Sequence, residues 1–306
     1  METQALLACP SCESAVAAIR YKYTWGGVES KIYRCDSCKF MFARPVPLDL
    51  LGQRQMDTVE DAELFRNPLL KKLHTKLIVG REISVVKGLL PGQNMSMLDI
   101  GCGTGWISSI WQSHGFSVLG LEPSEVRAKI ARERYGLEIV DSYIENFRSA
   151  HKFDLVVMRH VVEHFADPFA VLQQALSHLR EGGYVIVVVP NIDCIGRYLF
   201  DTKWTWVLPY HCNFFTPKSL RALAGRAGIE MSRMYQTPSP LWYPESFLRL
   251  IPHGESLRKR LYGKLSLLSL LPFTPVVALG YLLRLSDNIT LIGRKRTVLP
   301  SPGTMQ

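Results

Sequence analysis

The feature that most constrains the fold is an alternation, between residues 95 and 190, of short apolar runs with segments of helical spacing. Runs that are apolar throughout suit strands buried on both faces, as in a parallel sheet with helices on either side. The sequence therefore predicts an α/β domain with a doubly wound sheet. The expected strands are Met97–Ile100, Phe116–Leu121, Leu155–Met158 and Tyr184–Val189, and the expected helices lie near 105–114, 124–135 and 168–180.

A glycine-rich loop follows the first expected strand. Gly101, Gly103 and Gly105 stand at alternate positions after Asp99, with Cys102 between the first two. Glycine admits a positive φ and lets the backbone approach a ligand closely. A dinucleotide fingerprint would have the spacing G-x-G-x-x-G, whereas this loop has G-x-G-x-G. Because the Asp99 carboxylate would repel phosphate but accept hydrogen bonds from an ammonium group, we predict a ligand with a positive end.

Glu122 and Pro123 follow the second expected strand, and a carboxylate there can accept both hydroxyls of a ribose. On these residues alone, a tight turn with an incidental acid and a nicotinamide site both remain open. The loop and Glu122 together resemble the class I S-adenosylmethionine (SAM)-dependent methyltransferases, within them the type 11/23 enzymes such as those of ubiquinone biosynthesis. The resemblance implies a seven-stranded Rossmann-like sheet. It also implies SAM as cofactor, held by Asp99, Gly101, Cys102, Gly103, Gly105, Glu122 and Pro123.

The same resemblance implies further contacts to SAM. Tyr143 and Ile144, in the loop after the third strand, stand where the family reads the adenine edge. The alternative for Tyr143 is that its ring only covers the loop. Arg159 and His160 follow the fourth strand and are expected to line the methyl-donor pocket, with His160 near the methionine end.

The segment after the fourth strand contains the motif H-x-x-E-H. On a helix, His160, Glu163 and His164 would share one face. A zinc peptidase has the same motif, but this segment begins at the mouth of a parallel sheet. Some quinone-pathway O-methyltransferases bind a divalent metal on this face, so the three residues are candidate ligands. Pocket lining and a hydrogen-bonded structural role are the alternatives.

The segment Tyr210–Leu220 carries the expected acceptor chemistry. It resembles the family's H-x-x-F-F-T-P-x-S-L segment, with Thr216 as the N-cap and Pro217 as the first helical residue. Methyl transfer is an in-line displacement, so the protein must align the two reactants and, for a hydroxyl, remove a proton. We expect His211 to act as this base, with His164 as the second candidate.

Two C-x-x-C pairs near the N-terminus supply Cys9, Cys12, Cys35 and Cys38. Four thiolates suit a structural zinc ion with no open position, while an iron–sulfur cluster or unligated thiols are the alternatives. The pairs resemble the zinc ribbon that precedes many small-molecule methyltransferases, where it would cover the acceptor pocket or mediate contacts. The other cysteines, Cys102, Cys194 and Cys212, are expected to be ordinary buried thiols.

The chain divides into three expected parts. The zinc ribbon covers 1–47, a helical linker or cap covers 48–94, and the methyltransferase domain covers 95–306. A helix is expected at roughly 60–88, where apolar residues recur at helical spacing. These residues are Leu69, Leu70, Leu73, Leu77 and Ile78.

Most of the net charge of +9 lies near the C-terminus, where nine basic and three acidic residues follow position 240. Residues 265–283 are uncharged and belong to an apolar segment, 256–285. Pro272 and Pro275 interrupt this stretch, and the strand expected over 288–293 must return to the sheet, which argues against a membrane span. The segment is therefore expected to be buried, to cover the acceptor pocket, or to lie in an anionic membrane surface.

The first residues lack a basic start leading into an apolar core, so a cytoplasmic protein is expected. In the membrane alternative it would be peripheral to the inner face of the membrane, through 256–285. The expected activity is methyl transfer from SAM to a small-molecule acceptor, at a hydroxyl of a sugar, glycolipid or quinone-like precursor. The alternatives are an RNA methyltransferase and a SAM-binding protein without catalysis. Nucleic acid is not expected, because the ribbon has no dense basic run between aromatics. The oligomeric state is not predicted.

Overall fold

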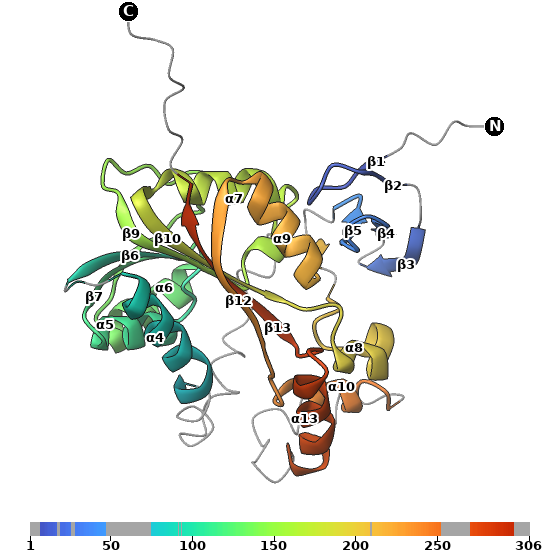
Figure 1. Ribbon diagram of the computed structural model, residues 1–306. Coiled ribbons are helices and arrows are strands. Elements are labelled where there is room, and N and C mark those ends of the chain that lie inside the picture. The colour runs from blue at the N-terminus through green and yellow to red at the C-terminus, as the bar shows by residue number, and fades with distance from the viewer. Residues whose placement is uncertain are drawn as a thin grey trace, which may run out of the picture.

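In the computed structural model, residues 7–16, 19–25, 28–46, 75–90, 92, 94–208, 210–251 and 270–296 are described. A seven-stranded sheet runs through the centre in the order β12-β13-β10-β9-β6-β7-β8 (Figure 1). Its strands are β6 (Met95–Ile100), β7 (Phe116–Leu121), β8 (Glu138–Val140), β9 (Phe153–Arg159), β10 (Leu179–Pro190), β12 (Ile229–Thr237) and β13 (Asn288–Lys295).

The pairing directions confirm the predicted fold class. Strands β8, β7, β6, β9 and β10 pair in parallel, whereas β13 pairs antiparallel with both β10 and β12. In a parallel sheet the carboxyl ends of the strands meet at one edge, which is where ligands bind in open α/β folds. The loops after β6, β7, β8 and β9 therefore converge at one edge of this sheet.

The four apolar runs predicted as strands lie within β6, β7, β9 and β10, and the strand expected over 288–293 lies within β13. The predicted C-terminal end of one helix was wrong. The helix expected to reach residue 180 ends at Ser177, because Leu179 already pairs with Phe153 at the start of β10. The register of β10 then shifts between Leu179 and Tyr184.

Helices cover both faces of the sheet (Figure 1). One face carries α4 (Gly80–Leu89), α5 (Trp106–Ser113) and α6 (Glu125–Tyr135), and the other carries α7 (Pro168–Ser177) and α9 (Pro217–Arg226). As predicted, Thr216 caps α9 and Pro217 is its first residue. The helix expected over 60–88 is described from Thr75, where a π-helical turn (Thr75–Val79) leads into α4. Its part before residue 75 lies outside the described residues.

The N-terminal module is built on strands β1 (Leu7–Ala8), β2 (Ala15–Val16), β3 (Ile19–Trp25), β4 (Val28–Arg34) and β5 (Met41–Arg44). Its four cysteines converge, with Sγ–Sγ distances of 3.6 Å for Cys9–Cys38 and for Cys12–Cys35. Sulfurs around a tetrahedral zinc with bonds of about 2.3 Å would lie about 3.8 Å apart. The cluster is therefore compatible with a zinc ribbon, although the boundary expected at residue 47 stays a prediction.

A strand from a distant part of the chain completes the sheet of this module. The order of that sheet is β11-β5-β4-β3, and β11 (Asn213–Phe214) comes from the segment predicted to carry the acceptor chemistry. Phe40 and Phe42 of the module are buried in the same core as Val171 of α7 and Leu220 of α9. The module is thus packed onto the helical face formed by α7 and α9.

The chain after β10 adds short helices beside the sheet: α8 (Ile195–Phe200), a 3-10 turn (Asp201–Lys203), α10 (Trp242–Leu248), a 3-10 turn (Leu271–Phe273) and α13 (Thr274–Leu282). The alternative that the apolar segment is buried was wrong for most of its described part, since the side chain of Leu271 is 62% exposed and that of Leu282 is 77% exposed. Residues 256–269 lie outside the described part. Within the part of the chain that is described, no helix has the length and apolar character needed to cross a membrane.

The tight packing of Gly105 predicts a large cost for adding one methyl group there. Gly105 has φ +78°, and a Cβ would lie 2.6 Å from Leu137 and 2.7 Å from Ala131. Gly115 has φ +90°, and no atom of the described residues would lie within 4 Å of its added Cβ, which makes it a matched control. We expect Gly105→Ala to lower the free energy of unfolding by about 3 kcal/mol or more, because overpacking adds to left-handed strain, and Gly115→Ala by only about 1–2 kcal/mol.

Urea unfolding of both variants measures this difference. Equal destabilisation of the two variants would contradict the close packing of the glycine loop against α6.

Candidate active site

A cavity of about 630 Å³ opens at the carboxyl edge of the parallel strands. This volume is in the range of cofactor and small-molecule sites. Of the residues predicted for the cofactor or for catalysis, Gly105 alone does not line the cavity, because it is the N-cap of α5 and packs against α6. The predicted residues that line it are Asp99, Gly101, Cys102, Gly103, Glu122, Pro123, Tyr143, Ile144, Arg159, His160, His164 and His211.

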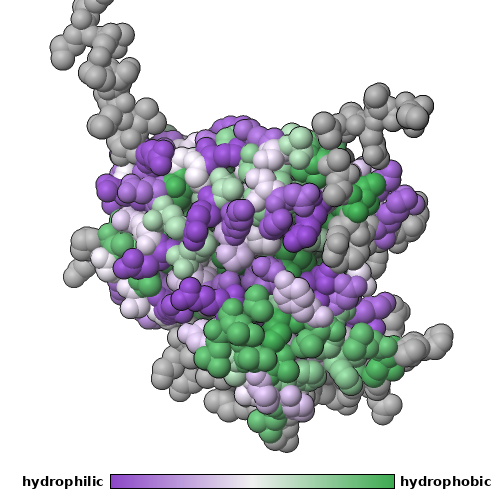
Figure 2. Space-filling view, turned by 45° about the vertical axis from the view of Figure 1, so that its right-hand side comes forward, coloured by the Kyte–Doolittle hydropathy of each residue, from purple (hydrophilic) through white to green (hydrophobic). Residues whose placement is uncertain are grey.

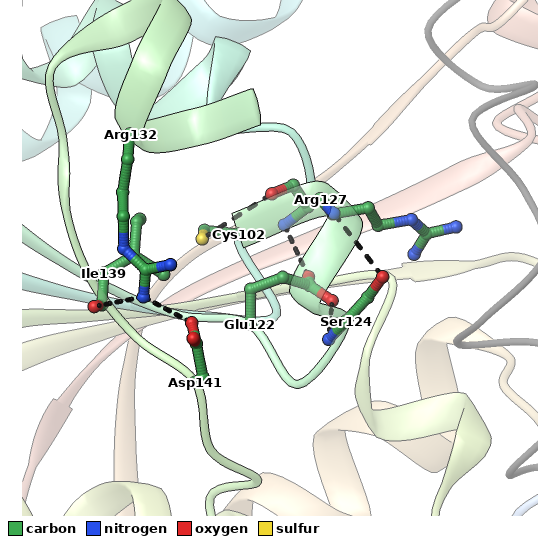
Figure 3. A network of polar contacts seen from close by, with 8 residues as sticks. Cys102, Glu122, Ser124, Arg127, Arg132, Ile139 and Asp141 are labelled. Atoms are coloured by element: carbon green, nitrogen blue, oxygen red, sulfur yellow. Dashed lines mark hydrogen bonds and ion pairs between the residues drawn. The ribbon is translucent and has the colours of Figure 1, made fainter. Parts of the chain in front are cut away.

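The glycine loop is held by the carboxylate of Glu122 (Figure 3). Glu122 accepts hydrogen bonds from the backbone N–H of Gly103 at 2.8 Å and from that of Ser124 at 3.0 Å. The side chain is buried, and burial raises its pKa while these two hydrogen bonds oppose the rise. The loop after β6 and the acid after β7 are therefore joined directly and form one wall of the cavity.

The loop after β8 is anchored by Arg132 of α6 (Figure 3). Its guanidinium donates to the carbonyl of Ile139 at 2.9 Å and pairs with the carboxylate of Asp141. This brings the following residues to the cavity, where Ile144 is buried and Tyr143 is 39% exposed. Tyr143 thus has its ring partly open to the solvent.

Two buried acids, one lining the cavity and one behind it, contribute charge to the site. Asp99, at the end of β6, accepts a hydrogen bond from Ser108 Oγ at 2.6 Å, and burial raises its pKa to about 6. Glu82, on α4, pairs with the Arg159 guanidinium at the end of β9. Sequence reasoning missed Glu82, although an acid between the apolar residues of an expected helix was a usable signal.

The turn after β9 departs from the predicted helix. His160 has φ +53°, and only Val162–His164 form a 3-10 turn, so His160 does not share a helix face with His164. The His160 Nδ1 lies 3.3 Å from Glu163 Oε1, and its ring stacks on Trp206 with centroids 4.8 Å apart. Candidate ligand atoms of Glu163 and His164 converge instead with one of His211, within 4.8 Å of one another, so metal binding at this cluster stays a prediction.

The two histidines of this cluster are oriented by backbone carbonyls. His211 Nδ1 lies 2.9 Å from the carbonyl oxygen of Trp206, and His164 Nδ1 lies 3.1 Å from that of Tyr210. A carbonyl can only accept, so Nδ1 is the protonated nitrogen of each ring, an assignment made from these distances. In a neutral ring Nε2 then carries the lone pair that can accept a proton or bind a metal.

Aromatic side chains that the sequence reasoning missed form the wall near these histidines. Trp206 contacts the edge of Trp242 with ring centroids 4.8 Å apart, and Phe165 and Tyr210 also line the cavity. Trp206 precedes His211 in the chain, and Trp242 belongs to α10. The aromatic run between residues 204 and 210 was the available signal.

The described residues offer two groups of metal-ligand atoms. One is the Cys9, Cys12, Cys35 and Cys38 cluster, and the other is Glu163 with His164 and His211. Glu163 is completely buried, and within the described part of the chain its carboxylate accepts no hydrogen bond, although His160 Nδ1 lies 3.3 Å from its Oε1. A buried carboxylate without hydrogen bonds is costly, so this group of ligand atoms fits either a proton or a divalent cation.

The remaining cysteines divide in two. Cys194 and Cys212 are buried as predicted. Cys102 was expected to be an ordinary buried thiol, but it is only half-buried and lines the cavity.

Comparisons with known proteins agree with this architecture. Residues 75–233, just over half of the chain, match the methyltransferase domain family. A ubiquinone biosynthesis O-methyltransferase from Ruegeria sp. is 30% identical over 216 residues, which cover 58% of this chain and 85% of that protein. One from Cereibacter sphaeroides is 30% identical over 159 residues, 46% of this chain, and the match spans only 62% of that relative's length.

A solved structure shows the same fold. It is that of a candidate sarcosine dimethylglycine methyltransferase from Galdieria sulphuraria, with a TM-score of 0.51 and 17% identity over 73% of this chain and 86% of the other. The strand order, the glycine loop with its acid, and the domain match agree. The chain belongs to the class I SAM-dependent methyltransferase family.

Proposed function

We propose that this protein transfers the methyl group of SAM to a hydroxyl of a small molecule. The observation that carries the proposal is a single cavity with two chemically different walls. One wall has the glycine loop with Asp99 and Glu122, and the other has His164 and His211 among aromatic rings. The first suits a nucleoside with an ammonium group, and the second suits an acceptor that stacks and loses a proton.

In this proposal the cofactor lies along the ends of β6, β7, β8 and β9. Asp99 faces the ammonium group, Glu122 accepts the ribose hydroxyls, and Tyr143 and Ile144 border the adenine. Arg159, held by Glu82, supplies a cation for the carboxylate of the methionine part. Such charge-assisted hydrogen bonds are the strong ones available in a buried site.

The proposed transfer is a single displacement. The acceptor hydroxyl gives its proton to Nε2 of His211 as its oxygen attacks the methyl carbon. The bond between that carbon and sulfur breaks, and its electron pair stays on sulfur, which gives S-adenosylhomocysteine (SAH). The carbonyl of Trp206 holds the His211 ring in the tautomer this step requires.

The proposal includes one structural metal ion, and a second ion is an alternative for the acceptor step. Zinc would be held by Cys9, Cys12, Cys35 and Cys38 and would be structural, because four thiolates leave no open position. A divalent cation at Glu163, His164 and His211 would lower the pKa of a bound hydroxyl, and it is the alternative to proton transfer by His211.

The raised pKa of Asp99 predicts that cofactor affinity depends on pH. Its pKa is about 6, so the carboxylate is charged above pH 6 and neutral below it. Arg159 favours the charged form, while Glu122 and Glu82 oppose it. An ammonium group binds the charged form better, so we expect the affinity for SAH to be constant above pH 7 and about tenfold lower at pH 5.

Calorimetric titration with SAH between pH 5 and 8 measures this dependence. The Asp99→Asn variant, which has the same shape but no titrating group, should bind weakly with a flat profile. A wild-type profile as flat as that of the variant would contradict the role of Asp99.

The position of His211 predicts a selective loss of turnover. We expect His211→Ala to lower the rate of methyl transfer at least tenfold and to leave the affinity for SAH within twofold, because the SAM contacts lie on the other wall. The assay uses labelled SAM with a panel of catechols, polyprenyl phenols and nucleotide sugars. The matched control is His114→Ala, at an exposed position at the end of α5.

Unchanged turnover by His211→Ala would exclude His211 as the base. If an added divalent cation activates the wild type and Glu163→Gln abolishes this activation, the cluster would be assigned to metal binding in place of proton transfer.

A continuous apolar surface lies over α8, α10 and α13 (Figure 2). Helix α10 connects it to the cavity, since Trp242 and Arg249 line the cavity whereas Phe247 is exposed. Together with the basic excess after residue 240, this supports peripheral contact with an anionic membrane surface. The exposed apolar residues are Tyr198, Leu199, Phe247, Leu250, Ile251, Leu271, Leu279, Tyr281, Leu282 and Leu283.

Vesicle flotation tests this contact. We expect binding to vesicles that contain phosphatidylglycerol, and at least tenfold weaker binding by the double variant Leu271→Glu/Leu282→Glu, because charged side chains resist burial in lipid. Val126→Glu, at a 50% exposed position on α6, is the matched control. Equal vesicle binding by the double variant and the wild type would contradict the membrane contact. Self-association of the wild type that the double variant abolishes would also contradict it, because the apolar surface would then be covered by a second copy of the chain.

A further inference from the structure

We propose that the four-cysteine module acts as a brace for the acceptor wall of the cavity. The inference rests on the proposed function, because it concerns the residues assigned there to the acceptor step. The described residues that line the cavity begin at Ile78, so the described part of the module does not cover the pocket. It lies behind the cavity wall instead, where its strand β5 meets β11.

The first part of the brace is the pairing between β5 and β11. Asn213 is opposite Phe42 and Phe214 is opposite Met41 in an antiparallel ladder. The backbone N–H of Ala43 also donates to the carbonyl of Cys212 at 2.9 Å. Cys212 directly follows His211, so the module fixes the backbone next to the proposed base.

The second part connects this backbone to the turn that carries Glu163 and His164. The Cys212 N–H donates to the carbonyl of Glu163 at 3.0 Å, and the Cys212 thiol donates to that of His164 at 3.1 Å. The Asn213 side-chain amide donates to the carbonyl of Phe165 at 2.6 Å. Both segments that supply the Glu163, His164 and His211 cluster are therefore joined through two residues that β5 holds.

Arg44 adds a direct contact from the module to the same turn. Its guanidinium donates to the carbonyl of Ala166 at 3.0 Å. Ala43 and Arg44 are consecutive, so neighbouring residues of β5 reach both segments of the acceptor wall. The segments themselves lie 48 residues apart in the chain, as the contact between Cys212 and His164 shows.

The cysteine pairs fix the other end of β5. Thr216 Oγ1 donates to the carbonyl of Cys38 at 3.2 Å, and Ser11 Oγ donates to that of Ser219 at 2.7 Å. Arg226 donates to the carbonyl of Pro10 at 2.7 Å. Both cysteine pairs are thus attached to α9, and a metal between them would keep β5 in register with β11.

The contacts of the cofactor wall are separate from this brace. The glycine loop is fixed by Glu122 of the sheet edge, which binds the N–H groups of Gly103 and Ser124. Loss of the brace should therefore disturb the acceptor wall and spare the cofactor wall. This division distinguishes a brace from a module that only adds general stability.

The test uses the full metal-loaded chain and two substitutions at one position. Ala43→Pro removes the N–H that binds Cys212 and keeps all four cysteines, whereas Ala43→Gly keeps the N–H and is the matched control. We expect Ala43→Pro to speed amide exchange at least tenfold in 206–215 and 160–166. Exchange in 97–105 and the affinity for SAH should stay within twofold of wild type.

Two further measurements keep the test decisive. Metal analysis should find the module's metal in both variants, and spectra of ¹³C-labelled histidine should show altered resonances of His164 and His211 in Ala43→Pro alone. If Ala43→Pro does not fold, the same readouts apply to Cys12→Ala/Cys35→Ala, which removes the module's metal but leaves Glu163 and both histidines.

If a variant has lost the β5 pairing or the module's metal and its amide exchange in 206–215 is unchanged, the proposed brace would be overturned. Equal changes in 97–105 would also overturn it, because they would indicate general destabilisation. A wild-type chain that binds no SAH would instead contradict the proposed function, so the two failures can be told apart.

Discussion

The active site depends on one constraint, the convergence of parallel strand ends at a single sheet edge. The loops that follow β6, β7, β8 and β9 all begin at this edge. Strand β13 runs antiparallel beside β10, so the first residues of β13 lie at the same edge. The hydrogen bonds from Gly103 and Ser124 to Glu122 then join two of these loops into one wall.

Much of the fold and of the cofactor wall could be predicted because their signals are local. A strand buried on both faces is apolar at each position, and the runs in β6, β7, β9 and β10 show this directly. The glycine loop and Glu122 follow such strands immediately, so the sheet topology alone brings them together. The cap of α9 by Thr216 is likewise a contact between near neighbours in sequence.

The acceptor wall could be predicted only in part, because its geometry comes from contacts between distant residues. The positive φ of His160 breaks the helix that the H-x-x-E-H spacing indicated, and the ligand atoms of Glu163 and His164 converge with one from the distant His211. Glu82 and Arg159 are 77 residues apart. The pairing of β11 with the N-terminal module joins segments that no periodicity connects, and it gives the module a place behind the cavity wall.

The structure of the complex with SAH is the measurement that tests the central claim most directly. The account predicts that the ribose hydroxyls lie within hydrogen-bond distance of Glu122, that the ammonium group faces Asp99, and that the sulfur points toward His211. SAH bound elsewhere, or in the cavity with its ribose away from Glu122, would contradict the account.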